Sequence, residues 1–181
     1  NVVNAIHNNQ LPGSNLPIFI FGHSPGGVTA ILTASVISNP PAGVISAAAP
    51  HTPTPYNDRQ KQQLRSHGYL DSPSSRTGQN LRVGIEFLQE IDASPEHFDP
   101  TIAITKFNSP VSIIHGDADV TAPFQSAQKH AQAAGDRAIL HIIPKASHTF
   151  NAPNPLPLDQ TPPPATQQLF DLTLGFIQNH L

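Results

Sequence analysis

This chain contains four short apolar runs, and each run is bounded by turn-forming residues. They cover residues 17–21, 43–49, 111–115 and 138–143. Continuous apolar runs of this length are typical of strands that are buried on both faces of a sheet. The pattern therefore predicts four interior strands.

Segments with helical spacing lie before, between and after these runs. We expect the end of a short helix in residues 1–10 and helices at 28–37 and 122–134. A C-terminal helix is indicated by apolar residues at helical spacing: Leu169, Leu172, Phe176 and Ile177. Strands that alternate with helices imply parallel strands joined by right-handed crossovers. The predicted class is α/β, with a parallel sheet and flanking helices.

Residues 51–108 interrupt the alternation. This region holds most of the charged side chains and many turn formers, and helices are expected in it at about 57–66 and 79–92. It contains no internal repeat. We interpret residues 1–181 as a single domain that carries a cap-like insertion over about 51–108.

The amino-acid composition argues against several classes of binding partner. The 181 residues are 38% apolar and carry a net charge of −3, which argues against nucleic acid or an anionic membrane surface as the main partner. No apolar stretch approaches the ~18 residues of a membrane-spanning helix. The chain has no Cys, which excludes disulfides, zinc–thiolate sites and a cysteine nucleophile. The histidines show no metal-ligand spacing, so we expect no metal and no other cofactor.

One turn carries a chemical motif. Gly22-His23-Ser24-Pro25-Gly26 matches the nucleophile-elbow pattern Gly-x-Ser-x-Gly, and it joins an expected strand to an expected helix, as that pattern requires. We expect the glycines to be needed because side chains would collide in so sharp a turn. Ser24 Oγ should then project above the sheet. The alternative is a glycine-rich turn with an incidental serine.

A serine hydroxyl needs a base to take its proton, and the base needs a partner that fixes its tautomer. Two later strand ends offer such groups. The third strand runs into His115-Gly116-Asp117-Ala118-Asp119, and the fourth runs into a turn that ends at His148. The carboxyl ends of parallel strands share one sheet edge, where α/β folds bind ligands. Spacing alone leaves Asp117 and Asp119 both open as the acid.

Together these segments resemble the α/β-hydrolase superfamily, and within it the small dienelactone-hydrolase-like and esterase-like members. The resemblance rests on Gly-His-Ser-x-Gly-Gly, on the His-Gly-Asp-x-Asp turn and on the Ser-His-Thr-Phe-Asn segment, and it extends over nearly the whole chain. In that family the catalytic Asp usually stands three residues after the glycine of the acid turn. The resemblance therefore implies Ser24 as nucleophile, His148 as base and Asp119 as the residue that orients the base, with Asp117 as second choice. It also implies that His23 and His115 either support the site or pack beneath it.

Two features depart from the family pattern. Pro25 occupies the position whose backbone N–H binds the oxyanion in the family, and proline has no N–H. Losing one such donor typically costs about 10²–10³ in rate.

The second departure is the number of strands. The family sheet has eight strands, of which the four expected here correspond to the last four. We therefore expect the chain to be the C-terminal portion of a longer protein, with an unpaired edge at strand 17–21.

Two functions remain open from the sequence. The first is a serine hydrolase that cleaves small-molecule carboxylic esters, thioesters or lactones through an acyl-enzyme on Ser24. The second is a non-catalytic hydrolase-like remnant or binding module without a complete oxyanion hole. Candidates for substrate contact are Arg76 and Arg82, which suit a carboxylate, and Phe124 and Phe150, which flank the acid and the base. The alternative, which we favour, is that the two arginines are only solvated and that both rings pack in the core.

Overall fold

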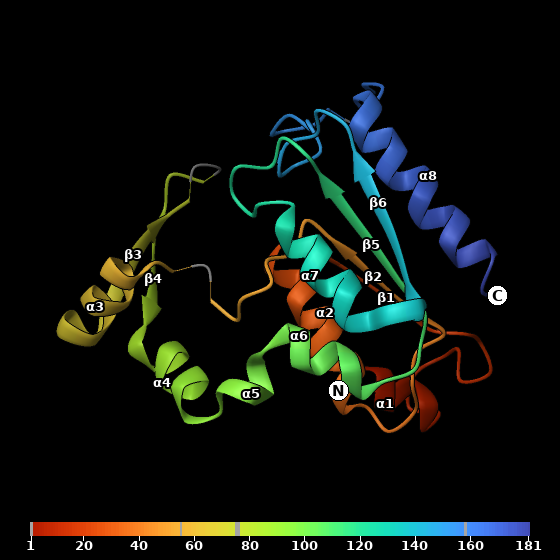
Figure 1. Cartoon of the computed structure of the whole chain (residues 1–181), viewed down its shortest axis with the longest axis horizontal. Coiled ribbons are helices and arrows are strands. Elements are labelled where there is room, and N and C mark those ends of the chain that lie inside the picture. The colour runs from red at the N-terminus through yellow and green to blue at the C-terminus, as the bar shows by residue number, and fades with distance from the viewer. Residues whose placement is uncertain (1, 55, 75–76, 158) are drawn as a thin grey trace.

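The computed structural model describes residues 2–54, 56–74, 77–157 and 159–181. A parallel sheet lies at its centre, with the strand order β1-β2-β5-β6 (Figure 1). The strands are Phe19–His23 (β1), Gly43–Ala47 (β2), Val111–Gly116 (β5) and Ala138–Ile143 (β6). The four predicted strands and the α/β class are confirmed, but only β2 and β5 are interior. Within the described ranges β1 and β6 are edge strands, because β1 pairs only with β2 and β6 only with β5.

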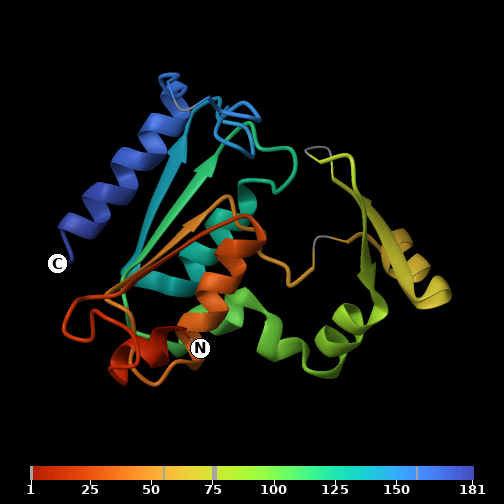
Figure 2. The same ribbon diagram turned by 180° about the vertical axis from the view of Figure 1, so that it is seen from behind.

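Helices cover both faces of the sheet (Figures 1 and 2). One face carries α2 (Pro25–Val36), α6 (Pro100–Ala103) and α7 (Gln125–Ala134), and the other carries α8 (Pro164–Gln178). Successive strand residues alternate between the two cores. Val44 packs with α2 and α7, whereas its neighbour Ile45 packs with α8. Burial on both faces explains why β2 and β5 are continuously apolar, whereas β1 and β6 are partly exposed.

The chain between β2 and β5 forms a series of short elements. They are α3 (Asp58–His67), β3 (Tyr69–Pro73), β4 (Asn80–Gly84), α4 (Ile85–Ala93), α5 (Pro95–Phe98), α6 and η1 (Ile104–Lys106). Figures 1 and 2 show α3, the β3–β4 hairpin and α4 to one side of the central sheet, with α5 and α6 leading back to it. A small core of Leu64, Leu70 and Leu88 holds this group together.

The helix predicted at 79–92 is wrong in its first part. Residues 80–84 form β4, which pairs antiparallel with β3 and places Val83 opposite Leu70. The helix begins only at Ile85, after Gly84. Val83 has helical spacing to the apolar residues of α4, but a strand partner that lies earlier in the chain decides its conformation.

Two short elements complete the described chain. They are α1 (Val2–His7) near the start and η2 (Gly135–Arg137), which joins α7 to β6. No helix within the described ranges is both long enough and apolar enough to cross a membrane.

Candidate active site

Ser24 lies in the sharp turn between β1 and α2. Its backbone has φ 57° and ψ −126°, a conformation that residues other than glycine rarely adopt and that is found mostly at functional sites. Gly22 permits this turn, because a Cβ there would overlap the carbonyl group of Gly26. Gly27 is equally constrained, since a Cβ would lie 2.8 Å from Ala49 Cβ.

The motif predicts that both of its glycines, Gly22 and Gly26, are needed, but Gly26 is not constrained by its neighbours. A Cβ at Gly26 would meet no atom within 4 Å. The expected collision at this position is therefore wrong. The close contact falls on Gly27 instead, where α2 passes over the end of β2.

The structure brings Ser24, His148 and Asp119 into one chain of hydrogen bonds. Ser24 Oγ lies 2.8 Å from His148 Nε2, and His148 Nδ1 lies 2.8 Å from Asp119 Oδ2. Ser24 follows β1, Asp119 follows β5 and His148 follows β6, so all three lie at the carboxyl edge of the sheet. If Nδ1 donates its proton to Asp119, Nε2 is free to accept the proton of the serine hydroxyl.

Asp119 is fixed on both of its carboxylate oxygens. Oδ2 accepts from His148, and Oδ1 accepts from the backbone N–H groups of Thr121 at 2.8 Å and Ala122 at 2.9 Å. Burial by itself would raise the pKa of Asp119, but these hydrogen bonds outweigh it and hold the pKa below its ordinary value. The carboxylate is therefore ionised at neutral pH and holds His148 in one orientation.

Asp117, the second choice for the acid, makes no contact with His148. Its Oδ1 accepts the backbone N–H of Lys145, and its side chain is otherwise exposed. This bond joins the turn after β5 to the turn after β6. Asp117 thus shapes the loop that carries His148, as Asp residues in turns commonly do.

His23 and His115 both support the three residues from behind. His23 Nε2 donates to the backbone carbonyl of His148 at 2.7 Å. The buried His115 donates from Nε2 to the carbonyl of Ala122 at 2.7 Å, and the same nitrogen lies 3.2 Å from Asp119 Oδ2. Burial lowers the pKa of His115, although the Ala122 carbonyl and Asp119 oppose the shift. A neutral His115 is consistent with one N–H that serves these two oxygens.

Backbone donors near Ser24 are few. The N–H of Ser24 itself donates to the carbonyl of Ala47 at 2.8 Å, and Pro25 has none. Gly27 donates to the carbonyl of Ser24 at 2.9 Å. Within the described part of the chain, the N–H of Gly26 has no partner and is the first free donor of α2.

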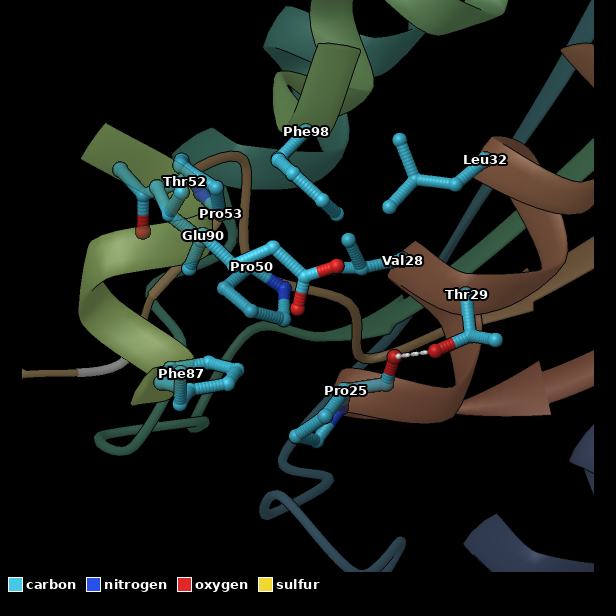
Figure 3. A pocket seen from close by; sticks show the side chains of 11 residues that line it. Pro25, Val28, Thr29, Leu32, Pro50, Thr52, Pro53, Phe87, Glu90 and Phe98 are labelled. Carbon is cyan, nitrogen blue, oxygen red and sulfur yellow. Dashed lines mark hydrogen bonds between the residues drawn. The ribbon is translucent and has the colours of Figure 1, made fainter. Parts of the chain in front are cut away.

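Ser24 and His148 open onto a pocket of about 310 Å³, a volume that suits a small ligand. A second hollow of about 310 Å³ adjoins it and shares Pro25, Pro50 and Thr52. Figure 3 shows Val28 and Leu32 of α2 facing Phe87 of α4 across this second hollow. Most of its lining is apolar, so it can bury an apolar group that extends from the neighbourhood of Ser24. Glu90 of α4 also lines it and adds a carboxylate.

No motif in the sequence predicts a polar group on the wall of the Ser24 pocket. His51 lines this pocket, and its Nδ1 lies 2.9 Å from the buried Ser126 Oγ. Lys129 Nζ donates to His51 Nε2 at 2.8 Å. These side chains come from separate segments, and no local spacing pattern relates them.

The other substrate candidates lie elsewhere. Arg82 pairs with Asp71 at 3.1 Å and stacks on Tyr69, and it does not line the pocket of Ser24. Arg76 lies outside the described residues. Phe150 is buried in the core beneath α8, so it serves packing. Phe124 is the N-cap residue of α7 and does not line the pocket. Within the described ranges, no three His, Asp or Glu side chains gather as a metal site.

Solved structures share this fold at low sequence identity. A monoacylglycerol lipase of Paleococcus ferrophilus matches with a TM-score of 0.69 and 13% identity, over 99% of this chain and 73% of the lipase. Est1E of Butyrivibrio proteoclasticus, solved with ferulic acid, matches with a TM-score of 0.67 and 14% identity, over 99% and 66%. The esterase domain of a Rhodothermus marinus protein matches with a TM-score of 0.55 and 18% identity, over 81% and 59%.

The chain therefore has a partial α/β-hydrolase fold, as the sequence motifs indicate. It spans 59% to 73% of the length of these three structures. No protein-family model and no curated protein sequence matches it. At these identities the likeness establishes the fold, and the chemistry has to be argued from the site itself.

Proposed function

We propose that this protein is a serine hydrolase that cleaves carboxylic esters through an acyl-enzyme on Ser24. The observation that carries the proposal is the hydrogen-bond chain from Ser24 through His148 to Asp119, which opens onto a pocket. The strained backbone of Ser24 supports it, because such strain persists mainly where function requires it. Esterases and lipases among proteins of the same fold are consistent with this chemistry.

The proposed reaction has two halves. His148 Nε2 takes the proton of Ser24 as Oγ attacks the ester carbonyl carbon, and His148 then gives that proton to the departing alkoxide. A water molecule attacks the acyl-enzyme while His148 takes its proton, and the carboxylic acid leaves as Ser24 regains a proton. Asp119 stays ionised throughout and stabilises the imidazolium that forms twice.

One observation favours a second candidate, a hydrolase-like module that binds ligands without turning them over. Pro25 offers no N–H to the developing oxyanion, and the N–H of Ser24 is already bonded to Ala47. A missing donor lowers the rate but leaves the nucleophile and base in place. The two candidates therefore differ in whether Ser24 reacts covalently.

Labelling with a fluorophosphonate probe tests the proposal directly. We expect the purified protein to be labelled and Ser24→Ala to be unlabelled with an unchanged melting temperature, because only one oxygen is removed. Ser35→Ala is the matched control, since Ser35 lies on α2 and, among the described residues, its hydroxyl bonds only the carbonyl of Leu32. Absence of labelling in the wild-type protein would favour the binding module, and labelling that survives Ser24→Ala would reject Ser24 as nucleophile.

A further inference from the structure

Two of the four lysines of this chain lie at the pocket of Ser24. Lys61, on α3, lines the pocket and is half-buried, and its ammonium group bonds no residue within the described ranges. Lys129, on α7, donates to His51, which lines the same pocket. Since Nε2 of His51 accepts this bond, Nδ1 carries the proton and donates to Ser126. His51 is thus neutral, and the positive charge of Lys129 is not paired with a carboxylate.

Two arginines elsewhere in the chain have their charge satisfied by the protein. Arg65 forms an ion pair with Asp92 at 2.8 Å, and Arg137 donates to the carbonyl of Ile104 at 2.8 Å. The protein as a whole carries a net charge of −3. The unpaired positive charge at this pocket is therefore opposite in sign to the net charge of the whole molecule.

No carboxylate among the described lining residues offsets the two lysines. Asp119 lies behind His148, and both of its oxygens are occupied. Asp99 raises the pKa of His51 to a small extent, but its Oδ1 is taken up by the N–H groups that begin α6. An anion in this pocket would therefore meet no carboxylate in the wall of the pocket itself, whereas Glu90 lines the adjoining hollow.

We infer that the pocket beside Ser24 selects esters that carry a carboxylate group, which Lys61 and the Lys129–His51 pair attract. This inference rests on the proposed function and specifies its substrate class. The volume of about 310 Å³ fits the half-ester of a short dicarboxylic acid. The ester carbonyl would meet Ser24, and the carboxylate would face the lysines.

Two esters that differ in one group test this inference. Ethyl hydrogen succinate and ethyl succinamate share a skeleton and an ester bond, but the first ends in a carboxylate and the second in a neutral amide. At pH 8 we expect kcat/KM to be about tenfold higher for the charged ester, a size typical of local electrostatic attraction. Lys61→Met and Lys129→Met should each lower that ratio by roughly three- to tenfold, and high salt should lower it in the wild type.

Lys106→Met is the matched control, because Lys106 is exposed and lines a separate hollow with His97. It should leave the ratio unchanged. A ratio that neither pocket variant alters would overturn the inference and leave ester hydrolysis standing. If the wild-type protein cleaves neither ester, the proposed function fails instead.

A binding measurement separates the inference from turnover. Calorimetric titration of Ser24→Ala should show tighter binding of ethyl hydrogen succinate than of ethyl succinamate. Adding Lys61→Met to this variant should reduce that difference. Equal affinity for the two esters in Ser24→Ala would overturn the inference whatever the activity.

Discussion

His130 makes the stability of this fold depend on pH. It lies on α7, is fully buried, and neither of its ring nitrogens has a hydrogen-bond partner among the described residues. Burial, followed by the smaller effects of His51 and His115, lowers the pKa of His130 from 6.5 to about 4, while Asp99 opposes the shift. The folded protein therefore keeps this ring neutral at pH values where the unfolded chain protonates it.

The sign and size of this pH effect follow from the pKa of His130 in the folded state and in the unfolded state. Between pH 6.5 and about 4 the unfolded state binds more protons, so the free energy of unfolding falls as the pH falls through this window. At about 1.4 kcal/mol per pH unit, the full loss is about 3 kcal/mol, of which about 2 kcal/mol is reached at pH 5. Above pH 7 this contribution is complete. Such a loss is a large part of the free energy of unfolding of a typical protein, which is about 5–15 kcal/mol.

Urea unfolding of the wild type and His130→Leu at pH 7.5 and pH 5.0 measures the effect. Leucine cannot titrate and leaves no buried polar atom unpaired, so His130→Leu should be at least as stable as the wild type at pH 7.5. Between the two pH values it should lose about 2 kcal/mol less than the wild type does. His97→Leu, at an exposed histidine, should keep the wild-type loss. An equal loss in the wild type and in His130→Leu would refute the reasoning.

Four further predictions concern the turns that hold Ser24 and its partners. Asp119→Asn should lower kcat for ester hydrolysis by about 10³–10⁴-fold because the base loses the group that fixes its tautomer, whereas Asp117→Asn should have a mild effect; the reverse ranking would move the acid to Asp117. Pro25→Met should raise turnover, by as much as ~10²-fold if the new N–H aligns with the oxyanion, and lower stability by only about 0.4–1 kcal/mol. Gly22→Ala should destabilise the fold by about 1–3 kcal/mol or more in thermal unfolding, because its Cβ overlaps a backbone carbonyl. Gly26→Ala should be neutral or stabilise α2 by up to about 1 kcal/mol, since the added methyl group meets open space.

The central sheet was predictable because its strands are defined by local pattern. Each is apolar on both faces, and the turn after β1 carries a motif that specifies its own geometry. The hairpin of β3 and β4 was not predictable in the same way. Its strands are mostly exposed and depend on pairing with each other, so Val83 shows helical spacing to α4 although it lies in a strand.

The choice between Asp117 and Asp119 needed three-dimensional information. A Cβ on Gly116 would overlap the carbonyl of Ala146, so the turns after β5 and β6 approach closely at this glycine. In that arrangement Asp117 reaches the backbone of Lys145 and Asp119 reaches His148. Spacing within either turn cannot reveal this, because it is set by how the two turns meet. The contact of Lys129 with His51 is hidden for the same reason.

Pro25 favours the start of α2 but removes a backbone donor beside the nucleophile. Its fixed φ suits the first position of α2, where the missing N–H costs the helix nothing. The same position borders the nucleophile, whose own N–H is held by Ala47, so the next free donor is that of Gly26. Among the described residues, the oxyanion of acyl transfer at Ser24 is therefore left to a donor one residue further along α2 or to side chains of the pocket. Pro25→Met distinguishes the cases: a gain in turnover means that a donor at position 25 is needed, and no gain means that Gly26 or a side chain already fills this role.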